Sequence, residues 1–412
     1  MPDSQVHLEP ETGGASSSGD EGRHRAGSAW TDCGTQRHRS GGLAEWTEAV
    51  RCHRRAVELL GGLPIDGNPG YLADLGAAWV NLGCALQSEP SRDCLGDALD
   101  AFDRAIGFLG RLPIETSPRF RHNLAAAWMN RAGAFARLDT EKSRAQAIRD
   151  YLRTIDLARG LPLDEKASFR ILLASSWINL GNLHQRRSDL PRAIGSYDAA
   201  VAALGSLPGS GHRLAIHHAA TAWTNRGEAL LCAAGRDNVS RAVESARNAL
   251  VELQGRDLGG AADAKLLLRA LRVIARGIEA CLNKSISGHS ADRVAELTDI
   301  AERGIDIALG SRASDPEVFD PFFMWFFSFG SRAYGRFQPQ FLAEFLEEIL
   351  RRCAARAGAA LEAEAREVAR RAAFGALEGL GRGRMMVAGT RNTVAILGAV
   401  RELRNAELHL IS

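Results

Sequence analysis

Lysine is scarce in this chain of 412 residues: only four of its 51 basic residues are Lys, and the other 47 are Arg. The basic residues are nearly balanced by 49 acidic ones, which leaves a net charge of +2. Nucleic-acid binding needs a strong basic excess or a basic patch, so we expect no nucleic-acid partner. The preference for Arg over Lys is typical of a genome-wide bias in composition.

The seven cysteines are scattered, odd in number and without a C-x-x-C pair. This pattern has neither a disulfide framework nor the spacing of a zinc site, so we expect reduced thiols, a cytoplasmic location and no metal site. No apolar run approaches 18 residues, and the N-terminus lacks the charged and apolar segments of a secretory signal. We therefore expect neither a membrane span nor export.

Common catalytic motifs are also missing. The chain has no G-x-x-x-x-G-K-[ST], no G-x-S-x-G and no H-E-x-x-H. The glycine-rich stretch Gly379 to Gly383 follows no predicted strand, so we interpret it as a helix break rather than a phosphate loop. The histidines, including His122 and the pair His217-His218, have no metal-ligand spacing. We expect no enzyme activity and no cofactor.

What the chain does contain is a recurring motif, Trp-x-Asn, often followed by Gly two residues later. Four of the seven Trp belong to it, at intervals of 49, 49 and 46 residues: Trp79, Trp128, Trp177 and Trp223. A fixed motif at a nearly fixed period is typical of a repeat protein.

Each repeat has the pattern of two helices. In the first, helix A begins near Pro69 after the capping residue Asn68, and Trp79, Leu82, Gly83 and Leu86 share one face. Helix B follows with a small, a large and a small residue on one face, and a Leu-Pro pair ends it. These triplets are Ala98-Phe102-Ala105, Ala147-Tyr151-Thr154, Ala193-Tyr197-Ala200 and Ala242-Ala246-Ala249. An earlier set, Ala49-His53-Ala56, indicates a leading helix B whose helix A is missing or lies in the poorly patterned residues before it.

These motifs, over residues 43 to 255, resemble the tetratricopeptide repeat family. Ala132 departs from the family's Gly, Arg131 and Arg226 depart from its Leu, and the period of 46 to 49 residues exceeds its usual 34. Most of the excess lies between one helix B and the next helix A, so we expect helices A of about 20 residues. The resemblance implies an all-α fold, an α-solenoid of helix-turn-helix repeats with a C-terminal helical module.

We expect three regions. Residues 1–40 are rich in Gly, Ser and charge and predict a disordered tail with an exposed Trp30. Residues 41–285 form the repeat array, whose last pair is degenerate and includes a helix from Lys265 to Leu282. Residues 286–412 form the helical module. Nine of the 15 Phe lie in 315–345, which we interpret as a sealing core, with a docking surface for a second copy as the alternative and a membrane contact as the least favoured one.

Two sets of side chains are candidates for packing and binding. We expect the Trp of each motif, with Gly83, Gly181 and Gly227, to pack the repeats. The Asn lies about 200° around the helix from its Trp and faces the inner surface: Asn81, Asn130, Asn179 and Asn225. The resemblance implies that such Asn hold the backbone of a bound peptide, while bonding to a neighbouring helix or water is the alternative. Arg137 and Arg186 share that face and are candidates for binding carboxylates, or are solvated surface residues.

The favoured function is non-catalytic protein recognition by an adaptor, scaffold or regulatory subunit. Its partner is a protein or peptide, with acidic character if Arg137 and Arg186 contribute, held in a concave groove. Two alternatives remain open: a regulatory part of an enzyme or effector system with activity in 286–412, and a dimer that assembles through 315–345.

Overall fold

The computed structural model describes residues 19–40, 43–88, 94–205, 213–253 and 261–282, and every regular element within them is an α-helix. The expected all-α solenoid of TPR-like repeats is therefore confirmed for these residues. The C-terminal module, 286–412, lies outside them. The helices are α1 (Asp20–Ser40), α2 (Leu43–Gly61), α3 (Pro69–Gln87), α4 (Leu95–Leu109), α5 (Pro118–Leu138), α6 (Glu141–Arg159), α7 (Ala167–Arg186), α8 (Leu190–Leu204), α9 (Arg213–Ala233), α10 (Arg236–Leu253) and α11 (Ala261–Leu282).

Local sequence explains where the helices begin and end. Asn68 caps α3 by accepting hydrogen bonds from the backbone N–H of Gly70 and Tyr71, and Pro69 is the first helical residue, as predicted. The predicted stop at Leu-Pro is wrong in detail. The second helices of the pairs end three or four residues earlier, and the residue that follows α4, α6 and α8 is Gly110, Gly160 and Gly205.

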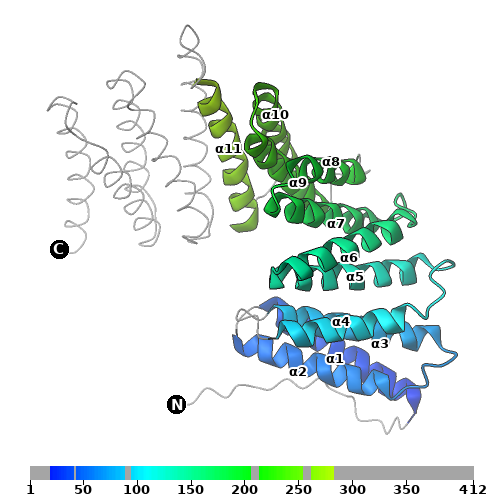
Figure 1. Ribbon diagram of the computed structural model, residues 1–412. Coiled ribbons are helices and arrows are strands. Elements are labelled where there is room, and N and C mark those ends of the chain that lie inside the picture. Colours follow the sequence, from blue (N-terminus) through cyan, green and yellow to red (C-terminus); the bar gives the residue numbers. More distant parts are fainter. Residues whose placement is uncertain (1–18, 41–42, 89–93, 206–212, 254–260, 283–412) are drawn as a thin grey trace, which may run out of the picture. The chain divides into compact units, whose positions relative to one another are not determined.

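The chain divides into two compact units, residues 1–215 and 216–412. In the first unit, α1/α2, α3/α4, α5/α6 and α7/α8 are packed pairs stacked in chain order (Figure 1). We call the first helices of these pairs (α1, α3, α5, α7) the A layer and the second helices (α2, α4, α6, α8) the B layer. Each A-layer helix contacts the next A-layer helix. Helices α3, α5 and α7 have 19, 21 and 20 residues, which agrees with the predicted length of about 20.

Glycine packs against a ring inside several pairs. A Cβ added at Gly83 would lie 2.5 Å from Cε1 of Phe102, and one at Gly181 would lie 2.6 Å from Cε1 of Tyr197. Glycine therefore lets the two helix backbones approach, and the ring fills the space beside it. In the second unit, Gly227 is buried against Val273 and the backbone oxygen of Ala242.

The prediction of a disordered tail is wrong for residues 20–40, which form α1 and pack against α2 and α3. Trp30 lies 49 residues before Trp79 and packs against a core that includes Leu60 and Leu75, so it is not the exposed residue we expected. A Cβ added at Gly34 would lie 2.6 Å from Cε1 of His53, so Gly34 packs against the His53 ring as Gly83 packs against Phe102. Helix α1 is thus the missing helix A of a first repeat.

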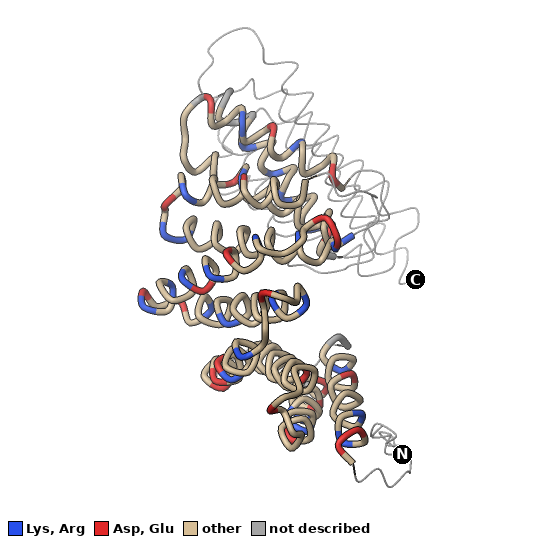
Figure 2. The backbone as a smooth tube through the Cα atoms, turned by 90° about the vertical axis from the view of Figure 1, so that its right-hand side faces the viewer, with Lys and Arg blue, Asp and Glu red and all other residues tan. Residues whose placement is uncertain are grey.

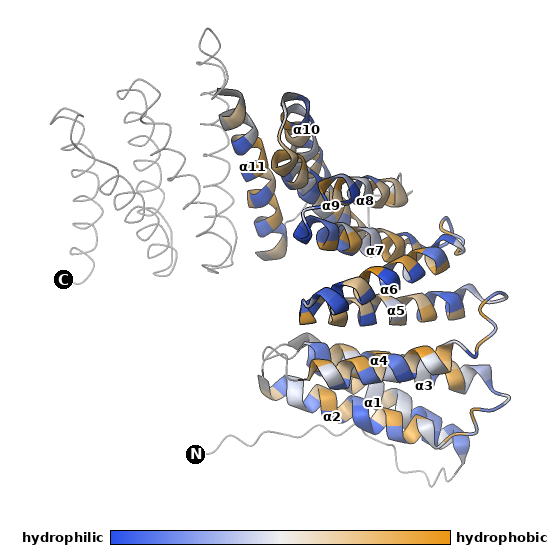
Figure 3. Cartoon of the chain, viewed as in Figure 1, coloured by the Kyte–Doolittle hydropathy of each residue, from blue (hydrophilic) through white to orange (hydrophobic). Residues whose placement is uncertain are grey.

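Apolar and polar residues are interleaved along the described helices (Figure 3). Buried Ala and Leu dominate the described interior, with Phe102, Tyr151, Phe169 and Tyr197 as its large rings. Helix α11 covers the predicted helix from Lys265 to Leu282. Among the described helices, none combines the length and the apolarity needed to cross a bilayer. Because α1 belongs to the first repeat, the array begins before the predicted boundary at 41, whereas the boundary at 285 stays a prediction.

Candidate functional site: the A layer

Three of the four predicted Asn, namely Asn81, Asn130 and Asn179, repeat at one register of α3, α5 and α7. Their side chains are partly exposed, and no hydrogen bond joins them to another described residue. The Trp that precedes each of them packs against the core from the other side of the helix. An amide group has two donors and an acceptor, so each of these side chains has unused hydrogen-bonding capacity.

Asn225 differs from the other three. Its side chain is only 6 % exposed, and its oxygen accepts a hydrogen bond of 2.7 Å from Nη2 of Arg269 on α11. Arg269 and Arg272 also pair with Glu228, and His217 lies 3.1 Å from Asp263. In the second unit, the helix position that carries the Asn therefore faces α11. The amide oxygen of Asn225 already has a hydrogen-bond partner there.

Asp74 shows that the same face joins helices in the first unit. Its carboxylate lies 2.8 Å from Nε2 of His24 on α1 and 3.3 Å from Nη2 of Arg119 on α5. Three successive A-layer helices are thus linked through one side chain. The residues of this face therefore lie side by side across three neighbouring helices.

Helices α5 and α7 carry six Arg and no Asp or Glu. Arg121 donates to the backbone oxygen of Gly160 and pairs with Glu115, and Arg170 repeats this 49 residues later with Ala203 and Asp164. These two Arg fix the segment before each helix to the end of its partner helix. This role of Arg121 and Arg170 was not predicted from the sequence, although their shared spacing of 49 residues could have indicated it.

Arg131 is the most deeply engaged Arg of this group. It forms a bidentate ion pair with Asp150 on α6, with N–O distances of 2.8 and 2.9 Å. Its Nη1 also lies 2.5 Å from Oδ1 of Asp103 on α4. The Asp150 side chain is only 2 % exposed. Arg131 thereby ties three helices together, so it is structural rather than available to a ligand.

The predicted carboxylate-binding pair lies near the C-terminal ends of its helices. Arg137 is partly buried on α5, and Arg186 is exposed on α7. Arg186 has no ion-pair partner among the described residues, and its charge lowers the pKa of Tyr151 against the larger rise that burial causes. The positive charge of Arg186 is therefore close to the α5/α6 pair and open to solvent.

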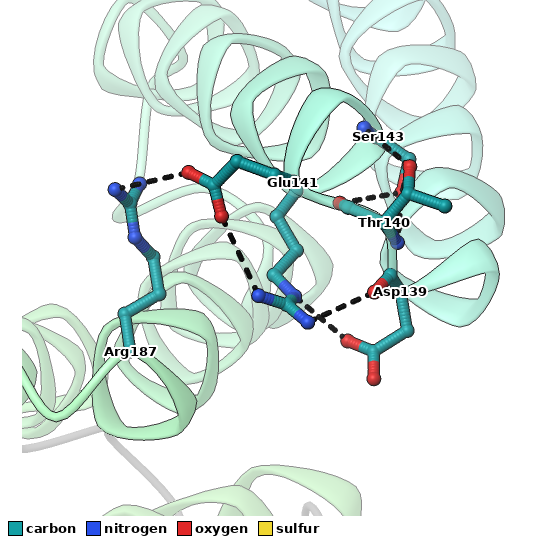
Figure 4. A network of polar contacts seen from close by, with 6 residues as sticks. Asp139, Thr140, Glu141, Ser143 and Arg187 are labelled. Atoms are coloured by element: carbon teal, nitrogen blue, oxygen red, sulfur yellow. Dashed lines mark hydrogen bonds and ion pairs between the residues drawn. The ribbon is translucent and has the colours of Figure 1, made fainter.

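The turn between α5 and α6 is held beside this end of α7. Thr140 and Ser143 form a capping box, and Arg144 binds both Asp139 and Glu141 (Figure 4). Glu141 also pairs with Arg187, the residue after α7, at 3.3 Å. The helix end that carries Arg186 is therefore anchored to the preceding pair.

Each Trp of the motif is partly buried and has a guanidinium over its ring. The group comes from Arg104 over Trp79, Arg131 over Trp128, Arg159 over Trp177 and Arg226 over Trp223, at 4.3 to 5.6 Å from the ring centroid. Where the family's Leu is replaced, at 131 and 226, the substituting Arg covers the Trp of its own helix. The two departures from the family pattern thus have a packing role.

The described residues contain no group of three His, Cys, Asp or Glu arranged to hold a metal ion. Basic and acidic residues are interspersed along the described helices (Figure 2). Burial lowers the pKa of His122 and His218, so both are neutral at physiological pH.

Comparison with known proteins gives similarity in fold only. No protein-family model and no curated protein matches the chain. Solved structures of TPR-like helical repeat proteins resemble it at low sequence identity. BtubC (BKLC) from P. vanneervenii is 17% identical, with a TM-score of 0.49 over 64% of this chain and 90% of that one. The apo quorum sensor NprR from B. thuringiensis is 13% identical, with a TM-score of 0.42 over 86% of this chain and 82% of that one. Apo RapI is 10% identical, with a TM-score of 0.44 over 95% of this chain and 94% of that one.

Proposed function

We propose that the protein is a non-catalytic adaptor, scaffold or regulatory subunit that holds an extended segment of another protein on its A layer. The observation that carries the proposal is the row Asn81, Asn130 and Asn179, which repeats at one register without a hydrogen bond to another described residue. A polypeptide in extended conformation presents N–H and C=O groups at regular intervals, and an amide side chain can pair with either.

The charge of the same face supports an acidic segment. Helices α5 and α7 lack carboxylates, and Arg186 is exposed without an ion-pair partner among the described residues. A guanidinium binds a carboxylate in a planar, bidentate geometry, whether the carboxylate belongs to a side chain or to the C-terminus of a chain. We propose that Arg186, with Arg137 one repeat earlier, binds Asp, Glu or a terminal carboxylate of the partner.

We also propose that the protein works in the cytoplasm, because the five cysteines described are free thiols. The aromatic segment 315–345, which carries the alternative of dimer assembly, lies outside the described residues. The alternative of enzyme activity in 286–412 concerns residues outside the description as well.

The test is capture of partners from the native host by the tagged full-length chain, with identification by mass spectrometry. The triple variant Asn130→Ala/Asn179→Ala/Arg186→Glu should lose capture, and a peptide from the identified partner should bind it at least about tenfold more weakly than the wild type. Arg153→Glu is the matched control, because Arg153 is an exposed Arg on the B layer. Equal binding by the triple variant and the wild type would reject the A layer as the site.

A further inference from the structure

Two cysteines face each other across the first helix pair. Sγ of Cys33 on α1 lies 3.3 Å from Sγ of Cys52 on α2. The neighbouring residues explain this approach, because Gly34 packs directly against the ring of His53 and brings the two backbones together. The two sulfurs are therefore in contact in the folded chain and need only a small movement to bond.

The equivalent positions in other pairs show that this contact belongs to the fold. Cys33 and Cys52 are 19 residues apart, as are Arg131 and Asp150 in α5/α6, which form an ion pair, and Arg226 and Ser245 in α9/α10, which are hydrogen-bonded at 2.6 Å. In α3/α4 the same positions hold Leu82 and Ala101, which belong to one buried cluster. The first pair is thus the case among these in which the two facing side chains can join covalently.

The two thiols differ in their surroundings. Cys33 is partly exposed and hydrogen-bonded to Arg37, whose guanidinium lies 3.4 Å from Glu45. Cys52 is 1 % exposed, and burial together with its hydrogen bond to Cys33 raises its pKa. A thiol next to a guanidinium and open to solvent is the one that reacts first, whereas a buried thiol reacts only with a partner that is already in contact.

We propose that Cys33 and Cys52 are a redox-active dithiol that a hydroperoxide converts to a disulfide, which locks α1 onto α2. Cys33 gives up its proton and attacks the peroxide oxygen, which forms a sulfenic acid and releases water or an alcohol. The sulfur of Cys52 then attacks the sulfur of Cys33, and its proton leaves with the displaced hydroxide as water. Two thiols are oxidised, one peroxide bond is reduced, and a dithiol reductant reverses the change.

The lock acts on the end of the array. Helix α1 contacts α2 and α3, and its His24 binds Asp74 on the A layer. A disulfide within the pair restricts the unfolded chain and opposes the separation of α1 from α2. Oxidation therefore holds the first A-layer helix in place, and reduction leaves it held by packing and hydrogen bonds.

The test treats the full-length chain with equimolar hydrogen peroxide, followed by alkylation and peptide mapping. We expect a peptide cross-linked between Cys33 and Cys52 that dithiothreitol removes, and trypsin cleavage within α1 at least about threefold slower in the oxidised form. The matched control is Cys33→Leu/Cys52→Ala, which copies the residues of α3/α4 and should show neither effect. Cys232→Ser removes an exposed thiol of the second unit and should behave as the wild type.

Three outcomes would overturn the proposal. One is sulfinic acid at Cys33 without a cross-link, and another is cross-linking mainly between chains or to other cysteines. The third is a Cys33–Cys52 disulfide that leaves cleavage within α1 unchanged, which would show that the bond forms without acting as a lock. Retention of stoichiometric Zn²⁺ by the reduced wild type, but not by the control, would instead assign the pair to a metal.

Discussion

His53 shows how one substitution changes a repeat. It occupies the position of Phe102 and Tyr151, and its ring packs against Gly34 as Phe102 packs against Gly83. Unlike a phenyl ring it has a polar atom to satisfy, and its buried Nδ1 has no hydrogen-bond partner among the described residues. The small–large–small pattern predicts the helix, but it cannot predict that the Nδ1 of His53 is buried without a hydrogen bond to another described residue. That destabilising effect depends on how deeply the ring is buried.

We expect His53→Phe to stabilise the chain and to reduce its sensitivity to acid. Burial, with a smaller effect of His38, lowers the pKa of His53 from 6.5 to about 4. Between these values the unfolded chain binds a proton that the folded chain does not, so stability falls as the pH drops from 6.5 to 4, by up to about 3 kcal/mol. At pH 7.5 the variant should gain about 1 kcal/mol, because the unpaired nitrogen is gone.

Thermal unfolding at pH 7.5 and pH 4.5, followed by circular dichroism, checks this prediction. The difference in Tm between variant and wild type should be larger at the lower pH. The other histidines with lowered pKa, such as His122 and His184, are present in both proteins and cancel. A difference that does not change with pH would show that His53 is not the acid-sensitive group.

At the scale of the helices, most helix positions could be predicted from the sequence because each pair repeats the same residue types at the same spacing. The helix starting at Pro69 and the Gly83–Phe102 packing follow from Trp79 and its neighbours. Helix α1 was predicted only as an alternative, a helix A in the poorly patterned residues before Ala49, because its apolar stripe is weak and His53 stands at the aromatic position of its partner helix. Counting 49 residues back from Trp79 reaches Trp30 and would have found it. The ion pair between Arg131 and Asp150 could not be predicted from the sequence, because it depends on how α4, α5 and α6 pack together.

Exchange of residues between pairs tests that ion pair. Arg131→Leu alone should lower the free energy of unfolding by roughly 3 kcal/mol, because among the described residues it leaves the buried Asp150 carboxylate with Gln146 as its one side-chain partner. Arg131→Leu/Asp150→Ala copies Leu82 and Ala101 of α3/α4 and should recover most of this loss. Urea unfolding of both single variants and the double variant gives the coupling energy. Arg144→Leu, at an exposed turn, is the control and should cost less than about 1 kcal/mol. Additive losses in the double variant would contradict a specific pair.

At the scale of the whole chain, the question is whether the N-terminal residues are a dispensable tail or the first helix of the repeat array. A disordered tail would be dispensable, whereas α1 is the first A-layer helix and covers the core beneath it. Trp30 packs there against a cluster that includes Leu60, Leu75 and Ala78. In a solenoid each repeat is stabilised by its neighbours, so loss of a terminal helix exposes the apolar face of the next one.

Deletion of residues 1–42 should therefore lower the Tm of the chain by several degrees and increase binding of a dye specific for exposed apolar surface. Deletion of residues 1–18 leaves α1 intact, so the difference between the two truncated chains isolates the contribution of that helix. The physical reason is that the core around Leu60 and Leu75 loses Trp30, while Asp74 loses His24. Equal Tm values for the two truncated chains would return α1 to the status of a dispensable tail and reduce the array by one repeat.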